Sequence, residues 1–249
     1  MFLHEKTYNL DDLTEFNTHV HTTFSRCASR EMNPLDIVKT AEKAGIKVLA
    51  MTDHNYPHKK GELVPQRLQI LDEIKNYETD MKILVGAELS SYDIGKFADE
   101  IETDMALDWR LYTTNHYHQD YWIHPEEKTA RNYCEHMLAI MDKVIESGRA
   151  DAFAHPFMAK YLGDYFDDFR IVTASFTDNE IGDIMTKANE KEITWELNVP
   201  AIFGDPVFHN RYFNIGKEVG VIFNIGTDAH KLKDIDVKQF IPELKKILY

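Results

Sequence analysis

The sequence contains few cysteines and no long apolar run, and both absences narrow the class of protein. Cys27 and Cys134 are the only two cysteines among 249 residues, and they lie far apart. We therefore expect no disulfide framework, and a reducing cytoplasm is the simplest location. No run of about 18 apolar residues occurs, so we expect no membrane span. The first residues also lack the basic-then-apolar plan of a signal peptide.

Positive charge is scarce as well. The chain has 28 Lys and Arg against 42 Asp and Glu, which gives a formal net charge of −14. Such a surface repels polyanions, and no dense Lys/Arg stripe offsets it, so we expect no nucleic acid partner. A small anion drawn to a local metal site is compatible with an acidic exterior. The sequence leaves the oligomeric state open.

Short apolar runs alternate with amphipathic stretches along the whole chain. We predict strands at residues 16–23, 47–54, 82–90, 110–117, 151–157, 193–199 and 221–228. We predict helices at residues 34–44, 65–77, 130–147, 178–191, 211–219 and 239–248. Residues 92–108 are acidic and weakly periodic, which indicates a loop with a short helix. Strands followed by helices, without a Gly-, Pro- or Ser-rich linker, predict a single α/β barrel domain over residues 1–249.

Potential metal ligands stand at the carboxyl ends of five predicted strands. The pieces are His19-Val20-His21, Thr52-Asp53-His54, Gly86-Ala87-Glu88, His155-Pro156 and Asp228-Ala229-His230. Barrel enzymes carry their chemistry at these strand ends. Imidazole and carboxylate groups suit zinc, iron and manganese, and the pieces together offer more ligands than one ion needs. The pattern predicts a hydrolase with two or three metal ions.

The spacing within the pieces supports shared ligation. His19 and His21 lie on the same side of an extended strand, because side chains alternate with period 2. The alternative is a pair of solvent-facing histidines. Glu88 follows a buried strand, where a carboxylate is costly unless it is paired or bound to metal, and its two oxygens can bridge two cations. Asp53 either holds a histidine through its second ring nitrogen or caps a turn.

Taken together, the motifs resemble those of the PHP family of metal-dependent phosphoesterases, the polymerase and histidinol phosphatase superfamily. The matching pieces are His19-Val20-His21-Thr22, Thr52-Asp53-His54, Gly86-Ala87-Glu88, Ala154-His155-Pro156, Trp195-Glu196-Leu197-Asn198 and Gly226-Thr227-Asp228-Ala229-His230. They occur in the order of the family and run over residues 16–230. The resemblance implies a distorted TIM-like (β/α)7 barrel, here a single PHP-type barrel domain over residues 1–249.

The resemblance also implies two or three divalent transition metals, which would be zinc, iron or manganese. The implied ligands are His19, His21, Glu88 and Asp228 for one ion, Glu88, His116 and His155 for a second, and His54 and His230 for a third. The ligand from the fourth strand is an inference between two candidates. We choose His116, and the rival is His118, which is two residues further on and faces the same way.

Two departures from the family pattern bear on the metal and on the substrate. Cys27 stands where related members often carry a histidine; its thiolate would favour zinc or iron over manganese. Alternatively Cys27 is unliganded and the third site is weak or empty. Lys160 occupies the position of a basic phosphate contact, but residues 199–204 supply no arginine. Arg26 or Lys59 could compensate from loops, and Lys160 could instead be an ordinary solvated lysine.

The function implied is hydrolysis of a small phosphomonoester by a metal-activated water, as in histidinol phosphatases. The expected partner is a small phosphorylated metabolite. Glu88 would bridge the ions, and Asp228 or His230 would transfer the proton, so no Ser or Cys nucleophile is required. The alternatives are a nuclease or exonuclease acting on phosphodiesters, which would need a basic groove, and a non-catalytic metal-binding module. The missing arginine weakens histidinol phosphate as the specific substrate.

Overall fold

Seven parallel strands form the centre of the computed structural model, which describes residues 2–249. Their order in the sheet follows the chain: β1 (Phe16–Val20), β2 (Val48–His54), β3 (Lys82–Asp93), β5 (Arg110–Thr113), β6 (Ala152–Phe153), β7 (Thr194–Asn198) and β8 (Phe223–Gly226). The two-residue strand β4 (Lys96–Phe97) pairs antiparallel with the end of β3. A parallel bridge between Val20 and Ala229 joins the first and last strands. The predicted (β/α)7 barrel is therefore confirmed as a nearly closed barrel.

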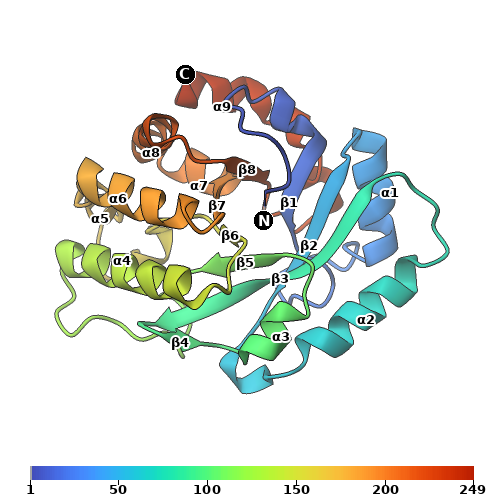
Figure 1. The fold of residues 1–249 in the computed structure, drawn as a ribbon, viewed down its shortest axis with the longest axis horizontal. Helices are drawn as coiled ribbons and strands as arrows, with labels where there is room; N and C mark the ends of the chain where they lie inside the picture. The colour runs from blue at the N-terminus through green and yellow to red at the C-terminus, as the bar shows by residue number, and fades with distance from the viewer. Residues whose placement is uncertain (1) are drawn as a thin grey trace.

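Helices surround this sheet, as Figure 1 shows. The longer ones are α1 (Pro34–Ala44), α2 (Leu63–Ile74), α4 (Ala130–Ser147), α6 (Asp178–Asn189), α8 (Pro206–Val219) and α9 (Ile241–Leu248). The short ones are α3 (Ile101–Met105), α5 (Arg170–Ala174) and α7 (Val199–Gly204). Five 3-10 turns add η1 (Asp12–Glu15), η2 (Pro57–Lys59), η3 (Lys160–Leu162), η4 (Leu232–Asp234) and η5 (Val237–Gln239). In helix α1, local sequence sets both ends: Asn33 caps the first turn, and Gly45 ends the helix at φ +78°.

The predicted elements differ from the observed ones mainly at their ends. The predicted strands 110–117 and 151–157 stop at Thr113 and Phe153, where the chain leaves the ladder. Helix α8 begins five residues before the predicted residue 211, because the Asp205 side chain caps it and Pro206 occupies its first turn. The predicted loop 92–108 also contains β4, and the short helices α5 and α7 were not predicted.

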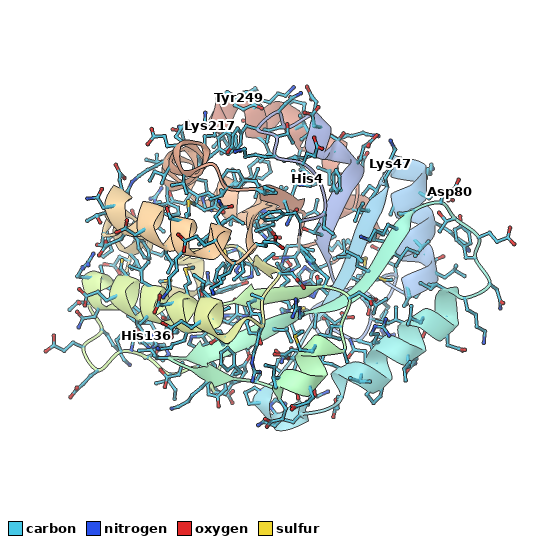
Figure 2. The ribbon with its side chains drawn as sticks, in the orientation of Figure 1. His4, Lys47, Asp80, His136, Lys217 and Tyr249 are labelled. Atoms are coloured by element: carbon cyan, nitrogen blue, oxygen red, sulfur yellow. The ribbon has the colours of Figure 1, made fainter. Side chains whose placement is uncertain are left out.

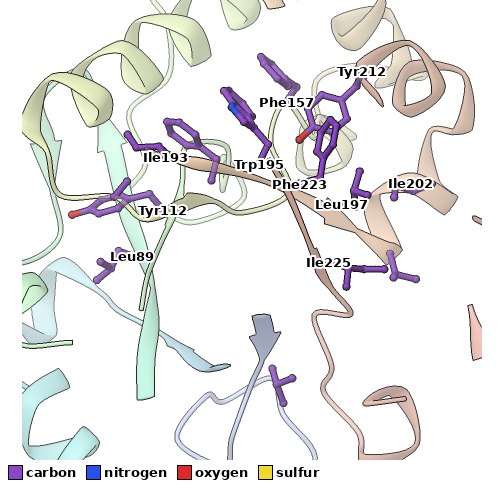
Figure 3. Packing of buried hydrophobic residues seen from close by; sticks show 14 of the residues in the cluster. Leu89, Tyr112, Phe157, Ile193, Trp195, Leu197, Ile202, Tyr212, Phe223 and Ile225 are labelled. Atoms are coloured by element: carbon purple, nitrogen blue, oxygen red, sulfur yellow. The ribbon is translucent and has the colours of Figure 1, made fainter. Parts of the chain in front are cut away.

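Outward-facing strand residues form the larger part of the core, between the sheet and the helices. Figure 3 shows Trp195 of β7 lying near Phe157 and Tyr212. The rings of Trp195 and Phe157 are stacked with centroids 5.7 Å apart, and those of Trp195 and Tyr212 are 6.3 Å apart. All three side chains are fully buried. Burial of rings of this size contributes strongly to the stability of the layer.

Inward-facing residues divide the barrel interior into two levels. The lower level is a small apolar cluster of Ala50, Leu84, Trp109, Leu111, Ala152 and Ala154. Leu3 packs against this cluster, and the N-terminus lies over the middle of the barrel in Figure 1. At Gly86 an added Cβ would lie 2.0 Å from the carbonyl oxygen of Trp109, so only glycine fits there. The apolar level supports the polar level at the carboxyl ends of the strands.

The surface carries most of the charge. Lys47, Asp80 and Lys217 lie near the periphery of the molecule in Figure 2. Many of these groups form exposed ion pairs, such as Lys47 with Glu15 at 2.6 Å, and such pairs contribute little to stability. Within residues 2–249, no helix combines the length and apolar character that crossing a bilayer requires.

Candidate metal centre

All eight predicted ligands lie together at the carboxyl end of the barrel. Neighbouring parallel strands bring them there: His54 of β2 is the register partner of Glu88 of β3. His155 and Asp228 take positive φ values of +28° and +50°, which are unusual for residues other than glycine. Backbone strain of this kind is concentrated at functional sites, where the surrounding structure maintains it. All of these side chains except those of His19 and His21 border a cavity of about 280 Å³, whose lining residues are Arg26, Cys27, His54, Tyr56, Glu88, His116, His118, Gln119, His155, Tyr161, Asp228 and His230.

One carboxylate oxygen of Glu88 faces the histidines of the first two strands. Its Oε2 atom lies 2.7 Å from His54 Nδ1 and 3.7 Å from the Nε2 atoms of both His19 and His21. The two Nε2 atoms are 3.1 Å apart, and Asp228 Oδ1 lies 3.0 Å from His21 Nε2 and 3.5 Å from His19 Nε2. The Nε2 atoms of His19 and His21 thus each lie within 3.7 Å of a carboxylate oxygen of Glu88 and of Asp228.

The other oxygen of Glu88 faces a separate pair of histidines. Its Oε1 atom lies 2.7 Å from His155 Nε2 and 3.2 Å from His116 Nε2, and both rings are buried. His118, the rival of His116, is exposed at the edge of the cavity with its ring 4.0 Å from that of Tyr161. The geometry therefore favours His116 over His118 as the ligand from the segment after β5.

The electrostatics of the cluster fit a group of cations. Glu88 is 1% exposed, and within residues 2–249 its Oε2 atom receives no well-directed hydrogen bond. Burial would raise the pKa of Glu88, but the charges of His54 and His116 hold it well below its usual value. Burial lowers the pKa of His21 to about 3, so its ring stays neutral and can offer a lone pair. A buried carboxylate among several imidazoles is a donor set that suits zinc, iron or manganese.

Glu196 orients two of the candidate ligands, a role that its motif alone did not reveal. Its Oε1 atom accepts a hydrogen bond from His19 Nδ1 at 2.8 Å, although 177 residues separate the two, and its Oε2 atom accepts the backbone N–H of His155. The carboxylate fixes the His19 proton on Nδ1 and leaves Nε2 facing the cluster. Gly226 makes room, because a Cβ there would lie 1.9 Å from Glu196 Oε1.

Asp53 acts on the cluster through an intermediate residue. Ser25 Oγ lies 3.1 Å from His21 Nδ1 and donates to Asp53 Oδ1 at 2.6 Å. Asp53 also accepts the backbone N–H of Thr22 at 2.8 Å. The sequence suggested that Asp53 either holds a histidine directly or caps a turn. Instead it fixes the loop after β1, and Ser25, which carried no signal in the sequence, makes the contact with the ring.

A third group of donors lies at the outer side of the cluster. His21, His54 and His230 each offer a ring nitrogen within 4.8 Å of the others. Cys27 Sγ lies 3.1 Å from His230 Nε2. Burial would raise the pKa of the Cys27 thiol, but hydrogen bonds with His230 and His54 prevail and lower it to about 7. The structure thus places the thiol next to both histidines implied for the third ion.

The two basic residues expected to contact phosphate occupy different positions. Arg26 lies in the exposed loop after β1 and lines the cavity. Lys160 begins η3, is exposed, and lines a separate small hollow near α7. Tyr56, Gln119 and Tyr161 also border the cavity, and no motif in the sequence pointed to them. The other histidines lie outside the cavity lining: His4, His58, His124, His136 and His209.

The fold and the site define a barrel protein with a buried cluster of candidate metal ligands. A sequence model of the PHP domain matches residues 17–193, which is more than half of the chain. The chain therefore belongs to the PHP domain family, and the resemblance inferred from its motifs is confirmed. Strands β7 and β8, with Asp228 and His230 after them, lie beyond the matched range but in the same sheet. The extension of the PHP domain over residues 1–249 stays a prediction.

The chain is similar to several proteins at low sequence identity. A probable phosphatase of Aliivibrio fischeri is 27% identical over 222 residues, covering 88% of this chain and 79% of that protein. A probable phosphatase of Vibrio parahaemolyticus is 25% identical over 231 residues, covering 92% and 83%. A crystal structure described as that of a "putative histidinol phosphatase" from Listeria monocytogenes superposes with a TM-score of 0.59 at 14% identity, covering 89% and 97%. At that identity the likeness supports the fold alone.

Proposed function

We propose that this protein hydrolyses small phosphomonoesters at a centre of two or three divalent metal ions. One observation carries the proposal: the two oxygens of the buried carboxylate of Glu88 face two separate groups of ring nitrogens. A carboxylate in this position suits a bridge between cations. The relatives described as probable phosphatases support phosphate ester hydrolysis as the reaction.

The ligands we assign follow the clusters of donor atoms. They are His19, His21, Glu88 and Asp228 for the first ion, Glu88, His116 and His155 for the second, and His54 and His230 for the third. When bound, such ions lower the pKa of a coordinated water and polarise the phosphoryl group. The chain itself supplies orientation: Glu196 holds the His19 ring, and Ser25 lies against the His21 ring.

Proton transfer and substrate binding fall to residues at the mouth of the cavity. Asp228 and His230 are 15% and 32% exposed, so Asp228 can exchange a proton with an entering or leaving oxygen, and His230 can do so when the third position is empty. His230 Nδ1 donates to the carbonyl oxygen of Asp228 at 2.7 Å, which leaves Nε2 facing the cavity. Arg26 also lines the cavity, where a guanidinium can form two hydrogen bonds with a phosphate.

The size and charge of the cavity favour a small ester over a nucleic acid. A volume of about 280 Å³ lies near the lower limit of small-molecule sites. Arg26 is the one Lys or Arg among the cavity-lining residues that the structure describes. Combined with the net charge of −14, this leaves little attraction for a polyanionic strand. The small phosphorylated metabolite is therefore the partner we propose.

A metal-dependent assay on three substrates tests this function. The protein is stripped with a chelator, reloaded with zinc, iron or manganese, and assayed on p-nitrophenyl phosphate, bis(p-nitrophenyl) phosphate and single-stranded DNA. We expect metal-dependent hydrolysis of the monoester, loss of it in Glu88→Gln, and retention in His58→Ala, which removes an exposed imidazole outside the cavity. Faster cleavage of the diester or of DNA would favour a nuclease. Metal binding without turnover on any substrate would favour a non-catalytic module.

A screen of phosphorylated metabolites then addresses the substrate. Helix α7, at residues 199–204, supplies none of the arginine that histidinol-phosphatase-like members place there. We therefore expect histidinol phosphate to be one of several monoesters accepted, with a kcat/KM no higher than that of the best alternative. A strong preference for histidinol phosphate would contradict this expectation.

A further inference from the structure

We propose that the thiolate of Cys27 is a ligand of the third metal position, together with His54 and His230. This inference rests on the metal centre proposed above. It adds one sulfur atom to a donor set that otherwise consists of nitrogen and oxygen.

The loop between β1 and α1 holds Cys27 from both sides. Before it, Ser25 Oγ donates to Asp53 Oδ1 at 2.6 Å, and the N–H of Ala28 donates to the carbonyl of Ser25 at 3.1 Å. After it, the N–H of Ser29 donates to the carbonyl oxygen of His230 at 2.9 Å. These bonds tie the loop to β2 and to the His230 segment, so the backbone holds Cys27 beside these elements.

The protonation of His230 directs a lone pair toward the sulfur. His230 Nδ1 lies 2.7 Å from the carbonyl oxygen of Asp228, which can only accept, so Nδ1 carries the proton. In a neutral ring Nε2 is then unprotonated, and it lies 3.1 Å from Cys27 Sγ. A hydrogen bond from the second ring nitrogen to a carbonyl is the usual support of a histidine ligand. A nitrogen and a sulfur lone pair therefore face the same small volume.

An independent feature of the cluster also points to a cation beside these donors. Glu88 Oε2 is buried, lies 2.7 Å from His54 Nδ1, and receives no well-directed hydrogen bond from residues 2–249. His54 lines the cavity next to Cys27 and His230. His54 therefore connects this buried carboxylate oxygen with the group that contains the thiol. A thiolate there favours zinc or iron over manganese at the third position.

Cys134 provides the contrast within the same chain. It is fully buried in α4, outside the cavity, and its Sγ atom donates to the carbonyl oxygen of Val172 at 2.9 Å. Burial raises the pKa of the Cys134 thiol to about 12. Cys134 therefore stays a protonated, structural thiol, and Cys134→Ala is a matched control for Cys27→Ala.

Cobalt substitution tests the assignment without any measurement of turnover. The stripped protein is loaded with Co²⁺, and the thiolate-to-cobalt charge-transfer absorption is recorded in the near ultraviolet. We expect this band in the parent and in Cys134→Ala. In Cys27→Ala we expect the band to disappear and the metal content to fall by about one ion per chain. Cys27→His should keep the metal content without the band. Circular dichroism of each variant confirms that it is folded.

X-ray absorption of the zinc-loaded parent adds a measurement that needs no variant. The expected spectrum contains a sulfur scatterer at about 2.3 Å. A parent with neither the cobalt band nor the sulfur scatterer overturns the assignment, and so does a band that persists in Cys27→Ala. Full phosphatase turnover without a sulfur signal would remove this inference alone. A sulfur signal without turnover on any ester would instead remove the proposed function alone.

Discussion

Alternate residues of strand β3 have opposite surroundings, although they share one backbone. Val85 and Leu89 face outward and are buried in the apolar layer under the helices. Leu84 and Glu88 face inward, the first into the apolar cluster at the base of the barrel and the second into the metal-ligand cluster. The outward face therefore stabilises the fold, and the upper part of the inward face holds chemistry at a cost in stability. Substitutions on the two faces should separate activity from stability.

Substitutions of two neighbouring residues of β3, one on each face of the strand, make this comparison most directly. Glu88→Gln should lower turnover by orders of magnitude and lower the free energy of unfolding of the metal-free protein less than an apolar core substitution does, because Glu88 lines a cavity. Leu89→Ala should cost about 2–5 kcal/mol of that free energy and leave kcat of the folded molecules near the parent value. Turnover and urea unfolding of the same preparations measure both. Near-normal turnover in Glu88→Gln would refute the bridging role.

A buried histidine with a lowered pKa should reduce the stability of the protein at low pH. A histidine whose pKa is raised by an ion pair instead loses its stabilising contribution at high pH. His209 of α8 is 2% exposed, and burial lowers its pKa to about 4. The unfolded value is about 6.5, so the neutral ring contributes fully above pH 6.5, and this contribution is lost as the pH falls to 4. Its size is roughly 3 kcal/mol, since each pKa unit corresponds to about 1.4 kcal/mol.

His209→Gln keeps a side-chain N–H but cannot titrate, so it isolates this contribution. We expect the free energy of unfolding of the variant to depend less steeply on pH between 4 and 6.5 than that of the parent. Chelated protein should be used for both, so that metal release does not enter the comparison. Curves that differ only by a constant offset would show that His209 does not titrate in this way.

Residues that only orient ligands should have intermediate effects. Glu196→Gln should weaken metal affinity about 10–100-fold, because the amide holds the His19 proton less firmly than the carboxylate does. The apparent dissociation constant from a zinc titration measures this change. Glu218→Gln, on the exposed face of α8, is the matched control and should match the parent. Equal affinities of all three proteins would leave Glu196 without a role at the centre.

The smallest effects are expected at the two candidate phosphate contacts. Arg26→Ala should raise KM several-fold with a smaller change in kcat, because its guanidinium borders the cavity and would contact the phosphate in both ground and transition states. Lys160→Ala should change KM less, because Lys160 lines a different hollow. Steady-state kinetics on p-nitrophenyl phosphate compare the pair. A larger KM change for Lys160 would reverse this order.

The barrel could be predicted from the sequence because the patterns that indicate its strands and helices are local. Short apolar runs located the seven parallel strands, and proline and glycine punctuation gave both ends of α1. The predicted strands that correspond to β5 and β6 extended too far at their carboxyl ends. His155 turns away with φ +28°, and the Asn115 side chain donates to its carbonyl oxygen at 2.9 Å. Such turns depend on contacts between distant segments, which local periodicity does not contain.

The candidate ligands could also be predicted from local sequence, but the residues that orient them could not. A histidine or carboxylate at a strand end is visible in one short segment. Glu196 meets His19 across 177 residues, and Ser25 meets His21 only because the loop folds back on Asp53. The signal for the early start of α8 was present in Asp205-Pro206, a cap followed by a proline, and was missed. Contacts between polar groups that are far apart in the chain therefore could not be predicted from the sequence.

The central claim is that the inward face at the carboxyl end of the barrel binds a bridged metal cluster that hydrolyses phosphomonoesters. A zinc titration of chelated protein, with bound ions per chain and p-nitrophenyl phosphate turnover measured at each point, tests it most directly. The account predicts no turnover without metal, a rise that requires at least two bound ions per chain, and neither the rise nor the second ion in Glu88→Gln. Turnover in the metal-free protein, or full turnover with one ion per chain, would contradict it.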